Sequence, residues 1–254
     1  MNVLVAVAAA GLLAGVPAYA SETDARIESS AKQSYVFKTY LKNDAVKVQS
    51  QDGAVTLTGT VAEASNKSLA EETVASLPGV KSVDNQLESA GERQEESSDG
   101  WVSMQVKYSL LFNRHVSGIN TQVFVTDGIV TLKGEAENQA QIDLAGQYAG
   151  DIKGVKDVKN EMTVAKGSSA PKKTTMGEKI DDASITAQVK MVFMMHRSTS
   201  AFKTSVETTG GVVTLSGKAT SAAGKELATK VANDVNGVTK VINNMTIEES
   251  LVKN

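Results

Sequence analysis

The feature that most restricts the fold of this chain is a segment that occurs three times. The sequences DGAVTLTGTVA, DGIVTLKGEAE and GGVVTLSGKAT begin at Asp52, Asp127 and Gly210. In each copy, the glycine of the segment's TG, KG or SG pair is followed 20 residues later by a Gly-Val pair, and an asparagine lies six residues after the first residue of that pair. Equal spacings indicate tandem repeats, so the 254-residue chain consists of three copies of one small unit.

The repeated glycines are predicted to be structural. They are Gly53, Gly59, Gly79, Gly128, Gly134, Gly154, Gly211, Gly217 and Gly237. Asp-Gly and Gly-Gly between β-branched residues are preferred hairpin turns, because both turn positions need positive φ. The third copy is therefore a hairpin and not a phosphate-binding loop, which would need glycine where Val212 stands and a hydroxyl residue where Ala219 stands.

Apolar spacing predicts two helices and a third strand around each hairpin. Ile185, Val189 and Val192 recur at helical spacing before the third hairpin. Second helices are predicted over residues 62–77, 137–152 and 222–235, and a last strand follows each of them with alternating apolar residues. The predicted fold class is α+β: three tandem αββαβ domains, each with two helices packed on a three-stranded mixed sheet.

The N-terminus predicts export. Residues 3–16 are an uninterrupted run of Val, Leu, Ala and Gly, and Ala18-Tyr19-Ala20 follows. This pattern is typical of a secretory signal peptide cleaved after Ala20, and the run is too short to span a bilayer. The basic start of such a peptide is absent, since no Lys or Arg precedes Arg26. We expect a periplasmic protein without a transmembrane span in the mature chain; an uncleaved anchor is the alternative.

Composition shifts predict the domain boundaries. After a signal peptide at residues 1–20, we expect domains at residues 21–88, 99–164 and 178–248, an acidic linker at 89–98, a basic Ser/Lys/Pro linker at 165–177 and a tail at 249–254. The net charge of −3 provides no basic field to attract nucleic acid.

This chain is poor in cysteine and histidine, which commonly serve as nucleophiles, bases or metal ligands. The chain has no cysteine and two histidines. His196 aligns with Asn113 and His115 with Ser198, so neither histidine recurs in the repeat, and a polar residue at a helix end is the better interpretation. Motifs of serine hydrolases, zinc proteases and EF-hands are absent. We therefore expect no catalytic residue, no metal and no cofactor.

An apolar cluster followed by a basic residue ends the first helix of each copy. The candidate residues for binding lipid or another partner are Phe193, Met194, Met195 and Arg197 in the third copy, and Leu111, Phe112 and Arg114 in the second. Three consecutive apolar residues span about 200° of a helix, more than one buried face covers. The cluster is either a core helix with one extra apolar residue or an exposed apolar tip with a cationic rim, suited to an anionic lipid surface or an unfolded polypeptide.

These features resemble the BON domain, a family named for bacterial osmotically inducible and nodulation-linked proteins. The resemblance rests on the helix DDASITAQVKMVFM, the hairpin VETTGGVVTLSG and the ending GVTKVINNMTI, and it covers all three copies. It implies αββαβ domains, envelope maintenance under stress and, for some members, contact with phospholipid. It names no catalytic residues.

Two functions stay open at this point. The first is a periplasmic adaptor that binds anionic phospholipid through repeated weak contacts. The second is a periplasmic chaperone or interaction scaffold under osmotic stress, which holds envelope proteins or unfolded clients. The third copy is the expected contact, because it alone has a net positive charge and Lys172-Lys173 precedes it.

Overall fold

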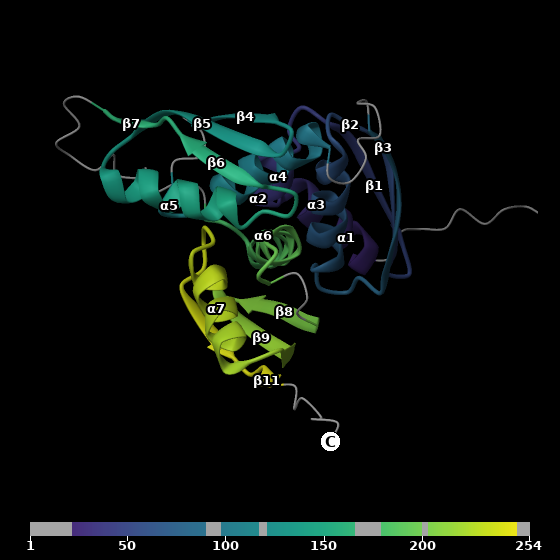
Figure 1. The fold of residues 1–254 in the computed structure, drawn as a ribbon. Helices are drawn as coiled ribbons and strands as arrows, with labels where there is room; N and C mark the ends of the chain where they lie inside the picture. Colours follow the sequence, from purple (N-terminus) through teal and green to yellow (C-terminus); the bar gives the residue numbers. More distant parts are fainter. Residues whose placement is uncertain (1–21, 90–97, 117–120, 166–178, 200–202, 248–254) are drawn as a thin grey trace, which may run out of the picture.

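The structure is a computed structural model that describes residues 22–89, 98–116, 121–165, 179–199 and 203–247. The expected signal peptide, the expected tail and most of both expected linkers lie outside the described residues. The described chain forms three α+β units in the predicted order of elements (Figure 1).

Each unit contributes its own helices and strands. Domain 1 has α1 (Glu22–Gln33), α2 (Tyr35–Thr39), β1 (Ala45–Gln51), β2 (Ala54–Val61), α3 (Ala64–Ala75) and β3 (Ser82–Ser89). Domain 2 has α4 (Asp99–Phe112), β4 (Thr121–Thr126), β5 (Ile129–Ala136), α5 (Gln139–Gly150), β6 (Asp157–Asn160) and β7 (Thr163–Val164). Domain 3 has α6 (Asp182–Met195), β8 (Lys203–Thr209), β9 (Val212–Ala219), α7 (Ala222–Asn233), β10 (Lys240–Asn243) and β11 (Thr246–Ile247).

The second hairpin strand is the central strand of every sheet. It pairs antiparallel with the first strand, as in β1 and β2, and parallel with the last, as in β2 and β3. The same arrangement holds for β4–β5–β6 and β8–β9–β10. The predicted mixed sheet is therefore confirmed. The expected single last strand is continuous only in domain 1; in domains 2 and 3 it is divided into β6 and β7, and into β10 and β11.

The repeated asparagine ties the last strand to the second helix. Asn160 donates from Nδ2 to the carbonyl of Ile142 at 2.7 Å, and its Oδ1 accepts from the backbone of Met162 at 3.3 Å. Asn85 and Asn243 make the corresponding pair of bonds in the other domains. One side chain thus satisfies backbone groups on two elements, which explains why each copy has an asparagine at this spacing.

An aspartate at the start of each first helix holds the hairpin turn. Asp99 accepts hydrogen bonds from the backbone of Asp127 at 2.7 Å and of Gly128 at 2.8 Å. Asp24 and Asp182 do the same for the turns of domains 1 and 3. Besides interacting favourably with the helix dipole, these carboxylates satisfy turn N–H groups that the sheet leaves unpaired.

The glycines predicted to be structural all have positive φ, between 77° and 131°. Gly217 shows the steric reason as well, because a Cβ there would lie 1.9 Å from the carbonyl oxygen of Lys203. At this position the backbones of two strands approach too closely for any side chain.

The first helix of domain 1 is interrupted, unlike those of domains 2 and 3. Ser34 separates α1 from α2 and caps α2, since its Oγ accepts from the backbone of Phe37 at 3.3 Å. The interruption leaves α2 with first-turn N–H groups that need partners from elsewhere.

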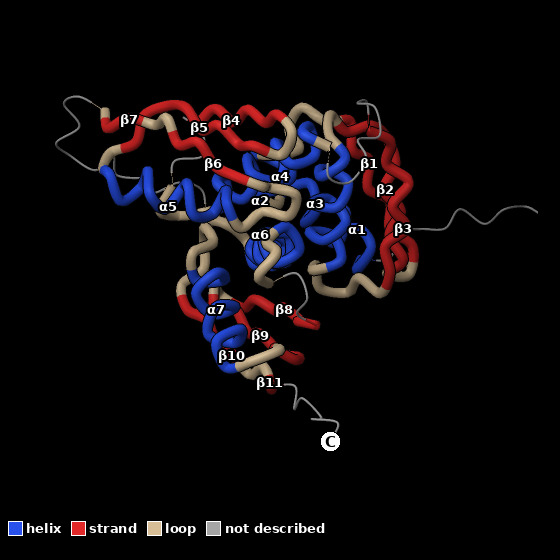
Figure 2. Tube along the Cα trace, in the orientation of Figure 1, coloured by secondary structure: helices blue, strands red, loops and turns tan. Residues whose placement is uncertain are grey.

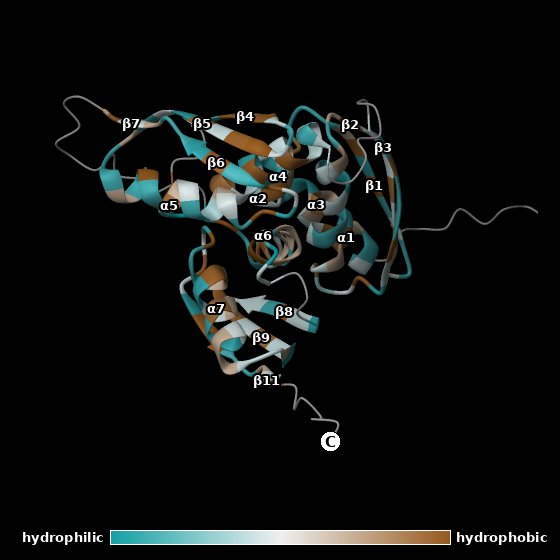
Figure 3. Cartoon of the chain, viewed as in Figure 1, coloured by the Kyte–Doolittle hydropathy of each residue, from teal (hydrophilic) through white to brown (hydrophobic). Residues whose placement is uncertain are grey.

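The three domains pack with their helices toward one another and their sheets outward (Figure 2). Helix α6 lies among them and packs against α3 of domain 1, α4 of domain 2 and its own β8. Eleven of its fourteen residues are buried. Apolar residues lie along α4 and α6 at the centre of the molecule (Figure 3). The apolar cluster that exceeds one helix face is therefore explained by packing on two sides.

Candidate functional site

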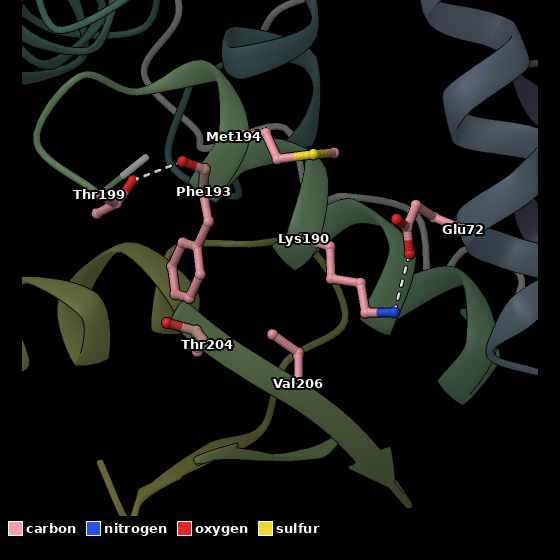
Figure 4. Close-up of a pocket in the computed structure, with 7 residues that line it drawn as sticks. All are labelled: Glu72, Lys190, Phe193, Met194, Thr199, Thr204 and Val206. Atoms are coloured by element: carbon pink, nitrogen blue, oxygen red, sulfur yellow. Dashed lines mark hydrogen bonds and ion pairs between the residues drawn. The ribbon is translucent and has the colours of Figure 1, made fainter. Parts of the chain in front are cut away.

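Most of the apolar residues of the candidate site are buried. Phe193 is 6% exposed, Met195 2% and Phe112 0%. Of the two alternatives, the exposed apolar tip is therefore wrong for these three residues. The Phe112 ring packs against Tyr40 of domain 1, and Phe193 faces Thr204 of its own domain (Figure 4). Leu111 is half-buried, and Met194 is 46% exposed. Of the five apolar candidates, Met194 alone is exposed enough for contact with a surface.

The two candidate arginines join domains 2 and 3. Arg114 donates from its backbone N–H to the carbonyl of Asp234 at 2.8 Å, and from its guanidinium to the carbonyls of Val235 and Val238. Arg197 donates from its backbone N–H to the carbonyl of Asp151 at 2.8 Å. Its guanidinium contacts the carbonyls of Gly150, Ile152 and Val155. The sequence assigned both arginines to a cationic rim, but here each caps the end of a helix in the other domain.

These contacts are reciprocal. The turns in return donate to the helix ends, from Asn236 to the carbonyl of Phe112 at 2.8 Å and from Lys153 to that of Met195 at 3.1 Å. Arg114 and Arg197 occupy the same position of the repeat, as do Asp151 and Asp234. We call this arrangement the arginine clasp: the two arginines and the two turns at residues 150–155 and 233–238. The same contacts are made in both directions, as in the interface of a two-fold symmetric dimer, but here the two partners are domains of one chain.

Domain 1 lacks both halves of the clasp. Thr39 stands at the repeat position of the arginine, and Pro78 stands where Lys153 and Asn236 donate their backbone N–H groups. Because proline has no N–H, the turn of domain 1 cannot make the return hydrogen bond.

A buried chain of polar side chains crosses the clasp. His196 Nε2 lies 2.7 Å from Ser109 Oγ, and His196 Nδ1 lies 3.0 Å from Asp151 Oδ2. Burial alone raises the pKa of Asp151, but the hydrogen bonds from His196 and Ser198 and the charge of Arg197 outweigh it and hold this pKa below its ordinary value. Tyr148 stacks edge-on to the His196 ring, and its pKa is raised by burial and by its hydrogen bond to Asp234.

The order serine, histidine, aspartate is that of a hydrolase triad, but the geometry does not suit catalysis. Ser109 lies inside α4 and is 1% exposed, so no substrate carbonyl can reach its hydroxyl. Because a hydroxyl both donates and accepts, Ser109 satisfies the histidine in either protonation state. The chain of hydrogen bonds is therefore a structural part of the interface.

An open groove lies beside Met194, between domains 1 and 3 (Figure 4). Its volume is about 210 Å³, and its lining residues are Glu72, Lys190, Phe193, Met194, Thr199, Thr204 and Val206. The Lys190 ammonium bonds the Glu72 carboxylate at 2.8 Å at one side of the groove. Apolar side chains thus share the groove with two hydroxyls and the paired ammonium and carboxylate, a combination that suits an amphiphilic ligand.

Neither a metal site nor a membrane helix is found in the part of the chain that the structure describes. The described residues contain no group of three or more His, Asp and Glu side chains placed to hold a metal ion. None of their helices combines the length and the apolar character needed to cross a bilayer.

The family model of the BON domain matches residues 23–91, 98–166 and 181–249. The chain belongs to the BON-domain family. Osmotically-inducible protein Y of Escherichia coli (strain K12) is 28% identical to this BON protein over 192 residues, which cover 76% of the chain and 92% of that relative. An uncharacterized protein in the gshII 5'region of Anaplasma centrale is 30% identical over 131 residues, 52% of the chain and 83% of that protein.

Two solved structures also align with this BON protein. They are CdsD, a structural protein of the type III secretion system of Chlamydia trachomatis, and the PrgH periplasmic domain. Their sequence identities are 17% and 10%, and the alignments cover 88% and 82% of this chain and 91% and 98% of those chains. The TM-scores of 0.23 and 0.20 are too low to indicate a common overall arrangement. The BON family and the similarity to osmotically-inducible protein Y point to a non-enzymatic protein.

Proposed function

We propose that this BON protein is an exported envelope protein of the osmotic-stress response that binds phospholipid surfaces. The similarity to osmotically-inducible protein Y supports the response, and the apolar run ending at Ala20 supports export to the periplasm. The observation that carries lipid binding is the exposed Met194 at the mouth of the groove, between apolar walls and the Lys190 ammonium.

The chemistry of the groove fits one phospholipid at a time. Phe193, Met194 and Val206 would contact part of an acyl chain, because apolar surface gains free energy when it leaves water. Lys190 has three N–H donors, and its bond to Glu72 leaves others for a phosphate oxygen. A single contact of this kind is weak, so binding depends on insertion of Met194 at the level of the headgroups.

Liposome flotation of the mature protein tests the proposal. Met194→Glu should weaken binding to anionic vesicles about tenfold or more, because fully burying a methionine contributes about 1.5–3 kcal/mol. Ile242→Glu is the matched control: Ile242 is 40% exposed in the same domain but lies on β10, away from the groove.

Each result has a defined meaning. Equal loss in both variants, or no loss in either, would show that the groove is not the contact. If the parent protein binds no vesicle of any composition, lipid binding itself is wrong. The chaperone alternative then predicts that the parent suppresses aggregation of an unfolded polypeptide.

A further inference from the structure

Domain 1 is attached to the rest of the molecule differently from the way domains 2 and 3 are attached to each other. The clasp contains four backbone hydrogen bonds, donated by Arg114, Lys153, Arg197 and Asn236. Within the described residues, no backbone-to-backbone hydrogen bond joins domain 1 to either neighbour. The polar contacts of Tyr35, Val36, Asn66 and Glu72 with the neighbouring domains each use a side chain as donor or acceptor.

One carboxylate caps two helices at this junction. Asp181 accepts from the backbone of Ser184 at 3.0 Å, which caps α6, and from the backbone of Tyr35 at 2.7 Å, which caps α2. Ser184 Oγ accepts from the backbone of Val36 at 3.1 Å. Domain 3 thus supplies the acceptors that the interrupted helix of domain 1 needs.

The ion pair of Glu72 and Lys190 is the second polar connection between domains 1 and 3. Both side chains are 29% exposed, so the pair is partly open to salt. Domain 2 adds a hydrogen bond from Tyr108 to Asn66 and an edge-on ring contact between Tyr40 and Phe112.

Domain 1 packs against a second face of α6 through α3. Ser184 contacts domain 1, and Gln188, Met191 and Met195 follow it at spacings that place them on one side of the helix. Ile185 lies about 100° further around the helix, beside Gly237 of domain 3, and Val189 follows it one turn later. Gln188 is 0% exposed, and its amide nitrogen and oxygen find no hydrogen-bond partner among the described residues. Burying such an amide without partners is unfavourable, and water would remove this penalty if domain 1 moved away.

We propose that domain 1 is a releasable cover over the apolar face formed by Met191 and Met195 of α6, and that release enlarges the surface that contacts phospholipid. The release rests on the weak junction and the unsatisfied Gln188; its effect on lipid contact rests on the proposed function. In the released form, two flexible methionines join Met194 in a continuous apolar strip along α6. The clasp holds domains 2 and 3 together meanwhile.

Thiol labelling tests release without any lipid. The chain has no cysteine, so Met191→Cys introduces the single thiol, and Val189→Cys provides the matched control on the side of the same helix toward domain 3. Release of domain 1 is enough to expose the thiol at position 191. The thiol at position 189 becomes exposed only when domain 3 itself opens. We expect labelling of Met191→Cys to be about tenfold faster, because opening of one part costs less free energy than global unfolding.

Glu72→Lys, added to both thiol variants, should accelerate only the labelling of Met191→Cys. Lysine is compatible with the helix here, since Lys230 occupies this position of the third repeat, and it repels Lys190. Equal labelling rates for the two thiols, or an equal response to Glu72→Lys, would overturn the release.

A reversible lock tests the link to lipid. Val36→Cys with Ser184→Cys introduces a thiol on each side of this junction, at two residues whose backbone nitrogen and hydroxyl oxygen lie 3.1 Å apart. The oxidised variant should bind anionic vesicles about tenfold more weakly than the same variant after reduction. Equal binding in both states would show that release does not serve lipid contact. Failure of both states and of the parent to bind would overturn the lipid function, while the labelling result still decides whether domain 1 is released.

Discussion

At the scale of single residues, the repeated side chains of this BON protein serve the backbone more than they serve ligands. The first-helix aspartates bind hairpin turns, the asparagines join strand to helix, and the arginines cap turns of another domain. Each of these residues looks from the sequence like a surface charge or a turn former. A charged side chain that satisfies buried backbone groups stabilises more than an exposed ion pair.

The hairpin aspartate gives a direct prediction. Asp99→Ala removes the acceptor for the N–H groups of Asp127 and Gly128. We expect it to lower the free energy of unfolding by about 2 kcal/mol, because hydrogen bonds to a charged group contribute about 1.5–3 kcal/mol. Urea denaturation measures the change. Asp157→Ala, on an exposed strand residue, is the control and should change stability by less than about 0.5 kcal/mol. Similar losses in both would mean that the turn does not depend on Asp99.

The clasp arginine gives a second prediction. Arg197→Thr reproduces the residue that domain 1 has at this position, Thr39, and removes the guanidinium from the carbonyls of domain 2. The free energy of unfolding of domains 2 and 3 should fall by about 1–2 kcal/mol. Arg26→Thr, at an exposed position of α1, serves as the control for the change of charge. Unchanged stability of Arg197→Thr would show that the guanidinium contacts are not maintained in solution.

At the scale of elements, some glycines can be replaced by alanine and others are required by steric constraints. Gly150 ends α5 without positive φ, and a Cβ there would lie at an ordinary 3.7 Å from Val158. Domain 1 has Ala75 at the same position of the repeat. Gly217, by contrast, has φ of 117° and a carbonyl where its Cβ would stand.

These two positions predict opposite effects of the same substitution. Gly150→Ala should raise the melting temperature slightly, since alanine favours a helix by up to about 1 kcal/mol over glycine. Gly217→Ala should destabilise domain 3 by more than about 2 kcal/mol, because it adds both backbone strain and a steric clash. Thermal unfolding followed by circular dichroism distinguishes them. A loss of stability in Gly150→Ala would contradict the position of that helix end.

The elements themselves could be predicted because repeat spacing and local chemistry define them. Asp52-Gly53 fixes a turn without any information about other domains, and the alternation in the last strand fixes a sheet face. What sequence reasoning missed depends on contacts between domains. Phe112 looks like a surface residue of an isolated domain, but its ring packs against Tyr40 of domain 1. The matching positions of Arg114 and Arg197, and of Asp151 and Asp234, were the available signal for the clasp.

At the scale of the whole molecule, pH should change the stability of the interface between domains 2 and 3. Asp151 has a folded-state pKa below its ordinary value of 3.8. A lowered pKa contributes stability that is present above the unfolded value and is lost as the pH falls through the folded value. We therefore expect the clasp to weaken below about pH 4. Asp151→Asn should flatten the decline of unfolding free energy between pH 5 and 3, measured by urea denaturation at about five pH values.

His196→Asn is the companion variant for that titration. Asn113 occupies the same position in domain 2, so asparagine is compatible with a clasp helix end, yet it cannot bear the positive charge that lowers the pKa of Asp151. The acid decline should therefore be shallower in this variant too. A decline identical to that of the parent in both variants would locate the acid sensitivity elsewhere.

The missing clasp residues of domain 1 also limit how copies of this protein can associate. A repeat that has both the arginine and the turn that accepts it carries two complementary binding surfaces. Units of that kind can associate head to tail into open filaments. Domains 2 and 3 occupy each other's clasp surfaces. Because domain 1 has Thr39 and Pro78 at the corresponding positions, it has neither of these surfaces. Within the described residues, no clasp half is left over to recruit another molecule. The clasp residues that the structure describes therefore give this protein no route to filaments when its concentration rises.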